Sequence, residues 1–279
     1  MSDTLCTEQQ PAFGIREMLC PVLSNEWINA EYKHLVVSAT GRFLEAEPGQ
    51  FFNLKCPVNA NDHPFLRRPM SVYLVDRAQG RIEFLYKVHG AGTRALASLQ
   101  AGAQLDVLGP LGKGFVLGDT PGHLLLLGRG AGIATLAPLA ECVRNRGGKV
   151  TALLSARSTT LLTSHERLLE AQASVITVTD DDGSSEVSAV AQRLRHIHAE
   201  TPFDLLAACG SQRLIHLLQS FCREYDVPGQ VALEQRMACA IGMCFACVHP
   251  IRKHIESEAL SYQRVCCDGP VFDYRLVIA

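Results

Sequence analysis

HLLLLGRGAG, at residues 123–132, is the stretch that decides the fold of the second half of this chain. Its continuous apolar run is typical of a strand buried on both faces of a parallel sheet. A helical pattern follows at residues 133–146, so the glycines lie in the turn between strand and helix. Strand-like and helix-like segments then alternate as far as residue 225, which predicts a doubly wound α/β domain over residues 119–228.

The residues before this domain have a different pattern. Short β-like runs, separated by turn signals such as Pro48-Gly49 and Gly109-Pro110, predict a small antiparallel β-barrel over residues 1–118. Their apolar and polar residues alternate only in part, so the register is left open. The expected strands are residues 15–22, 27–37, 49–55, 70–76, 81–88 and 104–109.

The C-terminal residues concentrate thiols in two stretches, RMACAIGMCFAC at residues 236–247 and VCCDGP at residues 265–270. Cys239, Cys244 and Cys247 are spaced C-x4-C-x2-C, and a distant further cysteine follows at Cys266 or Cys267. This is the plant-type pattern for a [2Fe-2S] cluster. Small neighbouring residues let the backbone approach the sulfurs closely. We therefore expect a third segment, residues 229–279, that holds a cluster.

The same thiols could instead bind a structural zinc, form disulfides or remain free. Zinc sites normally use paired C-x2-C knuckles, and only Cys244 and Cys247 form one. Disulfides require an oxidising compartment, of which the sequence shows no sign. The other six cysteines are scattered singly, as buried thiols of a reducing cytosol would be. The spacing favours the cluster.

Composition and charge narrow the class of protein. The 279 residues are 47 % hydrophobic and 19 % charged, so the chain can bury a large core. The formal net charge of −2 argues against nucleic acid as the main partner. The first residues show no signal-peptide pattern, and no apolar run is long enough to span a bilayer. We expect a cytoplasmic protein without a membrane span.

Glycines at the ends of two expected strands are candidates for binding a nucleotide. Gly128, Gly130 and Gly132 precede a helix, where backbone N–H groups can meet a phosphate, although the stretch is not G-x-G-x-x-G. Cys209-Gly210 ends a later strand and could line the same crevice. The alternative is a tight turn that binds nothing. For residues 180–184, DDDGS, a ribose contact and a solvated turn stay equally open.

The barrel carries its own candidates. Arg68 opens an expected strand and could pair with a phosphate, while a turn at Gly92-Thr93 offers N–H and hydroxyl donors. Each is also compatible with an ordinary turn or a solvated arginine. The histidines show no ligand spacing, and no Ser/His/Asp or paired-carboxylate grouping supports hydrolysis. We therefore name no catalytic residue.

Taken together, these motifs resemble the electron-transfer subunits of class 1B dihydroorotate dehydrogenase, within the ferredoxin-NADP reductase superfamily. The resemblance runs from about residue 15 to the C-terminus, includes LGPLGKGF at residues 108–115, and ends in CCDGPVF at residues 266–272. It implies that FAD contacts Arg68, Pro69, Met70, Ser71, Leu85, Tyr86, Lys87, Gly92 and Thr93. It also implies metal ligation by Cys239, Cys244, Cys247 and Cys266, with Cys267 as a bystander.

The chain departs from the family's pattern at three places. Arg129 stands where the family usually has glycine, which crowds or re-charges the dinucleotide turn. Ser185-Glu186-Val187 replaces the family's Tyr-Gly, which puts the nicotinamide site in doubt. The loop between Cys247 and Cys266 is longer and charged, with RKHIE at residues 252–256 on the expected partner surface.

The resemblance implies an oxidoreductase subunit that moves electrons between NAD(H), FAD, a [2Fe-2S] cluster and a partner dehydrogenase. The expected partner is an FMN-type dihydroorotate dehydrogenase of pyrimidine biosynthesis, in a hetero-oligomer. One alternative is a reductase subunit of the same superfamily that serves a different oxidoreductase. A third hypothesis, from another class, is a zinc- or redox-sensing module that binds a nucleotide without electron transfer.

Overall fold

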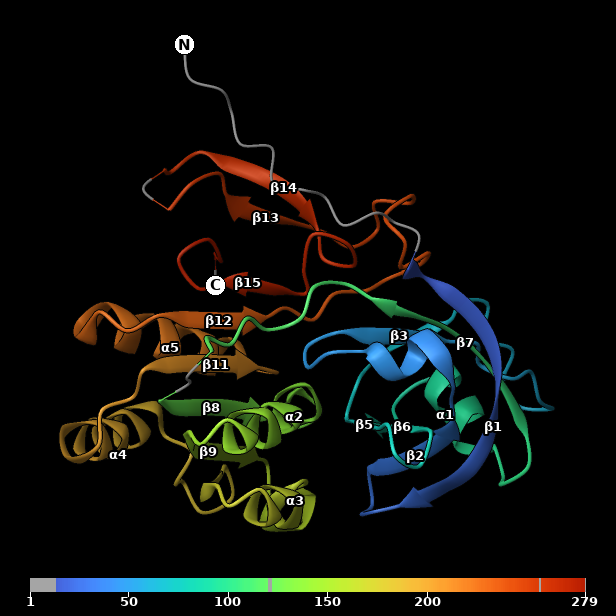
Figure 1. The fold of residues 1–279 in the computed structure, drawn as a ribbon, viewed down its shortest axis with the longest axis horizontal. Helices are drawn as coiled ribbons and strands as arrows, with labels where there is room; N and C mark the ends of the chain where they lie inside the picture. Colours follow the sequence, from blue (N-terminus) through green and yellow to red (C-terminus); the bar gives the residue numbers. More distant parts are fainter. Residues whose placement is uncertain (1–13, 120–121, 256, 279) are drawn as a thin grey trace.

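The computed structural model describes residues 14–119, 122–255 and 257–278. The N-terminal residues, the proline of the expected turn at 121–122 and residue 256 of the charged loop lie outside these ranges. A curled antiparallel sheet lies beside a layered α/β unit, and a cysteine-rich segment with a small hairpin extends past both (Figure 1). Within the described ranges, no helix is both long and apolar enough to cross a membrane.

The first unit is a seven-stranded antiparallel half-barrel with strand order β4-β3-β7-β1-β2-β6-β5. Phe52, Phe84 and Phe43 fill its interior with edge and tilted aromatic contacts. A short helix, α1 (Ala91–Ala97), packs Leu96 into the same core. The strands are β1 (Arg16–Trp27), β2 (Tyr32–Ser38), β3 (Phe51–Leu54), β4 (Arg68–Ser71), β5 (Leu74–Asp76), β6 (Arg81–Lys87) and β7 (Gln104–Leu111).

Two local expectations in this unit were wrong. The break expected after residue 22 is a register shift between Val22 and Ser24 within one long strand, and the turn comes at residues 28–31 instead. There the side-chain oxygen of Asn29 accepts hydrogen bonds from the N–H groups of Glu31 and Tyr32, which closes the turn. The expected turn at Gly92-Thr93 is the first turn of α1.

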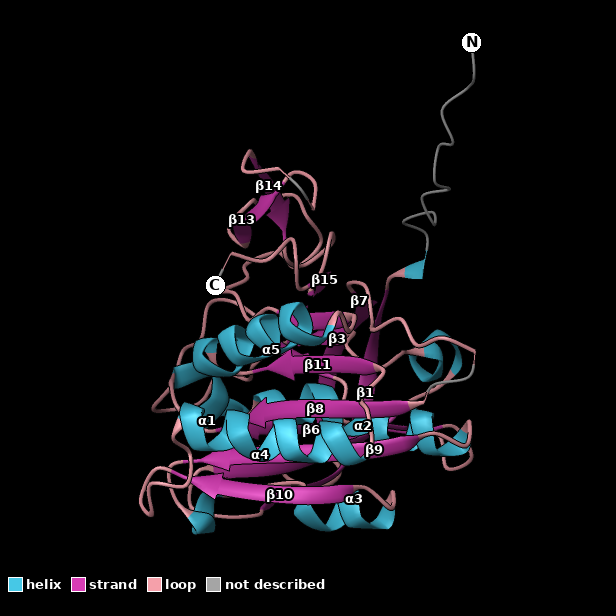
Figure 2. Ribbon diagram, turned by 90° about the vertical axis from the view of Figure 1, so that its left-hand side faces the viewer, coloured by secondary structure: helices cyan, strands magenta, loops and turns pink. Residues whose placement is uncertain are grey.

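The second unit is a six-stranded sheet in the order β10-β9-β8-β11-β12-β15 (Figure 2). The first five strands are parallel and β15 is antiparallel to β12. The strands are β8 (His123–Arg129), β9 (Lys149–Ala156), β10 (Ser174–Thr179), β11 (Leu205–Cys209), β12 (Gly229–Ala232) and β15 (Val271–Asp273). The helices are α2 (Gly132–Asn145), α3 (His165–Glu170), α4 (Val187–Glu200) and α5 (Gln212–Tyr225).

The leucine run is buried on both faces of this sheet, as the sequence predicts. Leu124 and Leu126 pack in one cluster with α2 and α3, whereas Leu125 and Leu127 pack in another with α4 and α5. Alternate residues of a strand point to opposite faces, so one apolar run supplies both layers. The second helix of the unit, expected from residue 161, begins only at His165, after a 3-10 turn at Thr159–Leu161.

The C-terminal segment starts inside the parallel sheet. β12 pairs with β11 and β15 pairs with β12, so the sheet continues past residue 228. Along the chain, β12 and β15 are separated by the cysteine-rich loop and by a hairpin of two strands, β13 (Val248–Arg252) and β14 (Leu260–Arg264). The division into three domains at residues 118 and 228 therefore stays a proposal. Its second boundary separates β11 from β12, which are paired in one sheet.

Candidate functional site

A hollow of about 290 Å³ lies where the carboxyl ends of the parallel strands meet the half-barrel. The barrel contributes side chains from the β1–β2 turn and from β6, and the α/β unit contributes the loops after β8, β9 and β11. In open α/β sheets, ligands bind outside the carboxyl ends of the strands. The lining residues are Glu31, Tyr32, Lys87, Arg129, Gly130, Ala131, Ala156, Arg157, Leu161, Gly210 and Glu234.

Two glycine turns pack backbone to backbone beside this hollow. A Cβ atom on Gly132 would lie 2.5 Å from the carbonyl oxygen of Cys209, and one on Gly210 would lie 2.9 Å from Gly132 Cα. Gly210 also has φ +91°, a conformation that other residues rarely adopt. The structure thus brings together Gly128, Gly130, Gly132, Cys209 and Gly210, the residues proposed for the nucleotide.

The side chain of Arg129 turns away from the glycine turn. Its guanidinium donates to Ser155 Oγ at 2.7 Å and to Asp180 Oδ2 at 2.5 Å. Arg129, together with Ser185, holds the pKa of Asp180 well below its usual range. Asp180 also accepts from Arg213 at 3.3 Å. The carboxylate that we considered for a ribose is therefore engaged by arginines, and the charge of Arg129 is balanced.

The residues proposed for FAD surround the start of α1 and the edge strand β4. A Cβ atom on Gly92 would lie 2.5 Å from Arg68 Cζ and 2.7 Å from Arg68 Nη2, so the guanidinium packs directly against this glycine at the start of α1. Ser71 on β4 accepts a hydrogen bond from Thr135 of α2 at 2.8 Å. An arginine held at a helix start suits a pyrophosphate, so these residues fit FAD.

Some proposed FAD contacts have their side chains engaged elsewhere. Leu85 and Tyr86 are buried, and the Tyr86 hydroxyl donates to Asn25 Oδ1 at 2.9 Å. The Thr93 hydroxyl accepts the N–H groups of His89 and Gly90 and donates to the Gly90 carbonyl, so it caps the start of α1, and its donor role toward FAD stays a prediction.

The thiols near the C-terminus gather in two pairs. The N–H of Cys239 donates to Cys244 Sγ at 3.5 Å, and the N–H of Cys244 donates to Cys239 Sγ at 3.4 Å. The N–H of Cys266 donates to Cys247 Sγ at 3.4 Å. Among residues 14–119, 122–255 and 257–278, no three His, Cys, Asp or Glu side chains gather as one metal ion would require. A two-iron cluster takes two thiolates on each iron, and this donor set fits it.

The loop geometry explains how the first pair forms. Ala240 and Gly242 have φ of 60° and 85°, so the backbone reverses direction between Cys239 and Cys244, and Phe245, with φ of 57°, turns it again before Cys247. Burial raises the pKa of Cys239, but the N–H groups of Cys244 and Ile241 outweigh it and lower that pKa to about 7. Backbone N–H donors thus favour the thiolate that an iron requires.

Cys266 and Cys267 are adjacent and differ in their surroundings. Cys266 is buried against Cys247, whereas the sulfur of Cys267 lies 3.6 Å from Cys266 Sγ and faces Gly242, where a Cβ atom would lie 2.8 Å from it. Burial and the neighbouring thiols raise the pKa of Cys266. The pairing with Cys247 supports our proposal that Cys266 is the fourth ligand.

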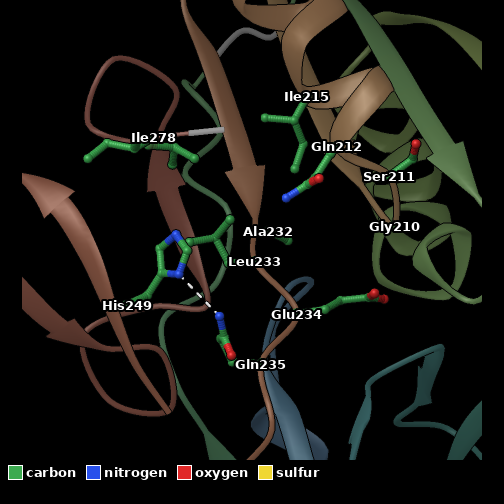
Figure 3. A pocket seen from close by; sticks show the side chains of 11 residues that line it. Gly210, Ser211, Gln212, Ile215, Ala232, Leu233, Glu234, Gln235, His249 and Ile278 are labelled. Carbon is green, nitrogen blue, oxygen red and sulfur yellow. Dashed lines mark hydrogen bonds between the residues drawn. The ribbon is translucent and has the colours of Figure 1, made fainter.

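One segment links the hollow to the thiols. Leu233-Glu234-Gln235 leaves the end of β12 and also borders a second hollow of about 300 Å³, beside the start of α5 (Figure 3). Gln235 bonds His249 of β13 at 3.1 Å, which fixes the segment to the hairpin (Figure 3). The side chain of Glu234 is exposed and accessible from the first hollow.

Sequence reasoning missed several residues of the hollow. Arg157 directly follows β9, and the rule that ligands meet carboxyl ends of strands could have found it. Glu31 and Tyr32 reach the hollow from the barrel turn, and no motif in the sequence marks them. Glu234 opens the stretch that resembles the family's cluster loop, but sequence reasoning did not place it beside a nucleotide.

The chain combines a flavin-type barrel, a doubly wound nucleotide unit and paired thiols near the C-terminus. This combination defines a ferredoxin-reductase-like oxidoreductase that also carries an iron–sulfur site. The family model for the "Oxidoreductase FAD-binding domain" matches residues 20–115. The model for the "Iron-sulfur cluster binding domain of dihydroorotate dehydrogenase B" matches residues 234–278.

Curated relatives extend the match to most of the chain. It is 36 % identical over 240 residues to "Dihydroorotate dehydrogenase B (NAD(+)), electron transfer subunit" of Bacillus caldolyticus, covering 85 % of this chain and 89 % of the relative. It is 35 % identical over 271 residues to the protein of that name from Streptococcus pneumoniae strain R6, and this match covers 95 % of this chain and 99 % of the relative. The chain belongs to the family of dihydroorotate dehydrogenase B electron transfer subunits.

Solved structures agree on the fold. A chain of the NADH-dependent reduced ferredoxin-NADP oxidoreductase matches with a TM-score of 0.77 and 26 % identity, over 94 % of this chain and 90 % of that chain. Ferredoxin-NADP+ reductase from Plasmodium falciparum matches with a TM-score of 0.61 and 14 % identity, over 77 % and 96 %. The second likeness shows the fold alone.

Proposed function

We propose that this chain transfers electrons between NAD(H) and the catalytic subunit of a dihydroorotate dehydrogenase, through FAD and a [2Fe-2S] cluster. When bound, FAD supplies hydride chemistry and the cluster supplies single-electron transfer, so one chain converts a two-electron donor into one-electron steps. The chain's own residues bind and orient these groups. No side-chain acid or base is required for that task.

The observation that carries this proposal is the segment between β12 and the thiols. Glu234 lines the hollow beside the glycine turns, and Cys239, the first thiol of the pairs, follows five residues later in the chain. Residues on one continuous stretch therefore border both the nucleotide side and the cluster side. Such a connection suits electron transfer between the two sites.

Each proposed residue has a definite task. Arg68, packed against Gly92 at the start of α1, would hold the FAD pyrophosphate. The turns at Gly130 and Gly210 would admit the dinucleotide to the hollow. The two thiol pairs would each hold one iron, with backbone N–H groups stabilising the thiolate charge.

The partner would approach from the thiol side. Cys244 is exposed, and Met243 and Phe245 beside it are 77 % and 63 % exposed. Large apolar side chains around an exposed ligand suit contact with another protein. The proposal includes a hetero-oligomer with an FMN-type subunit and a cytoplasmic location, a reducing compartment in which the singly scattered cysteines outside the thiol pairs would remain reduced.

The proposal is tested by purifying the chain anaerobically and recording its visible spectrum before and after NADH. We expect flavin bands and broad iron–sulfur absorption that NADH bleaches, and co-purification of a flavin-containing dihydroorotate dehydrogenase. A colourless protein from cells that assemble clusters would refute the cofactor assignment. Bands bleached by NADH with a different co-purifying oxidoreductase would refute the partner assignment and favour the second hypothesis.

A further inference from the structure

The hollow contains a carboxylate that engages cations from both halves of the molecule. Glu31, in the turn between β1 and β2, has its Oε2 atom 2.6 Å from Lys87 Nζ at the end of β6. The other oxygen of the same carboxylate is ion-paired with Arg157, the first residue after β9. Lys87 and Arg157 hold the pKa of Glu31 below its ordinary value, so the carboxylate is charged at neutral pH.

Arg157 occupies the position in the fold that contacts the adenosine ribose of a bound dinucleotide. In βαβ nucleotide-binding units, the first strand leads into the glycine turn, and the residue at the end of the second strand meets the adenosine ribose. An acid there accepts the 2′-hydroxyl of NAD, whereas an arginine accommodates the 2′-phosphate of NADP. Here β8 leads into the glycine turn and β9 ends next to Arg157. By that rule alone, Arg157 would favour NADP(H).

The carboxylate of Glu31 reverses this expectation. It balances the charge of Arg157 and places a negative charge where the 2′-phosphate would lie. A phosphate dianion would have to displace Glu31 from Arg157 and tolerate a carboxylate nearby, whereas a ribose hydroxyl can donate to it. We propose that Glu31, supplied by the barrel, makes this an NAD(H) site by occupying the arginine that would otherwise bind the 2′-phosphate.

An alternative role for the pair is to join the two halves of the molecule. The side chains of Glu31 and Arg157 are 26 % and 58 % exposed, and an ion pair so open to water adds little to stability. An open pair can, however, exchange partners with a charged ligand. The location in the hollow therefore assigns the pair to ligand selection. This inference rests on the proposed function, because it presupposes a nicotinamide dinucleotide in the hollow.

The test compares the affinities of the FAD-loaded full chain for NAD+ and NADP+ by isothermal titration calorimetry. We expect the wild type to bind NAD+ at least tenfold more tightly than NADP+. Glu31→Gln frees Arg157 and should lower this ratio at least tenfold, mainly through tighter NADP+ binding. Glu45→Gln, which removes an exposed carboxylate paired with Arg42 elsewhere on the barrel, should leave the ratio unchanged.

Further variants separate Arg157 from Lys87, which Glu31→Gln also frees. Glu31→Gln combined with Arg157→Gln should return NADP+ to weak binding, and a retained gain would overturn the assignment to Arg157. Arg157→Gln alone leaves Glu31 closer to the 2′-position and should weaken NADP+ further. Normal NAD+ binding with an unchanged ratio in Glu31→Gln would refute this inference alone, whereas a wild type that binds neither dinucleotide would refute the proposed function with it.

Discussion

Replacing Gly210 by alanine tests whether the two glycine turns shape the dinucleotide site. The new Cβ atom would lie 2.9 Å from Gly132 Cα and closer still to the carbonyl oxygen of Arg129, so both turns must separate by roughly 1 Å to reach ordinary contact. Forcing a packed site apart costs about 1–3 kcal/mol. The left-handed backbone at φ +91° adds about 1–2 kcal/mol for any residue with a Cβ atom. We therefore expect Gly210→Ala to lower the free energy of unfolding by about 2–5 kcal/mol in total.

Gly147 provides the matched control, because its φ is +80° and a Cβ atom there meets nothing within 4 Å. Gly147→Ala should therefore show only the backbone cost of about 1–2 kcal/mol. Urea unfolding followed by circular dichroism measures the free energy of unfolding of both variants, and calorimetric titration measures their affinity for NAD+. We expect Gly210→Ala to weaken NAD+ binding at least tenfold while Gly147→Ala does not. Equal stabilities and equal affinities for the two variants would contradict this account of the site.

Two further predictions concern the thiols and a buried histidine. Cys266→Ser should abolish the iron–sulfur absorption of anaerobically purified protein and Cys267→Ser should retain it, and the opposite result would move the fourth ligand by one residue. Burial lowers the pKa of His123, whose ring Nδ1 bonds the Thr201 carbonyl oxygen at 3.2 Å. The unfolded state therefore binds more protons below pH about 6.5, and the free energy of unfolding should fall as the pH drops through the lowered pKa. The free energy of unfolding is measured by urea titration at pH 7.5 and at pH 5.5. His123→Asn should reduce the difference between the two values, whereas His196→Asn, which changes an exposed histidine, should not. The same difference in His123→Asn as in the wild type would refute the assignment.

Local patterns in the sequence determined the elements that depend on neighbours in the chain. The leucines of β8 predicted a strand buried on both sides, because an uninterrupted apolar run leaves no face for water. The spacing of Cys239, Cys244 and Cys247 predicted the cluster loop, because a short loop must bring thiolates to one place. The same reasoning misjudged Gly92-Thr93, where a glycine after a strand marked a helix start and not an isolated turn.

The tertiary structure alone decided which distant residues meet. No local pattern could pair Glu31 with Arg157, which are 126 positions apart, or direct Arg129 toward Asp180, 51 positions away. Nor could it add β15 to the parallel sheet, since pairing of strands depends on where the intervening chain returns. The sequence by itself thus determined the kinds of cofactor that the chain is built to hold. The charges that line the hollow were decided by the docking of the barrel on the α/β unit, because a hollow between two units takes its side chains from both.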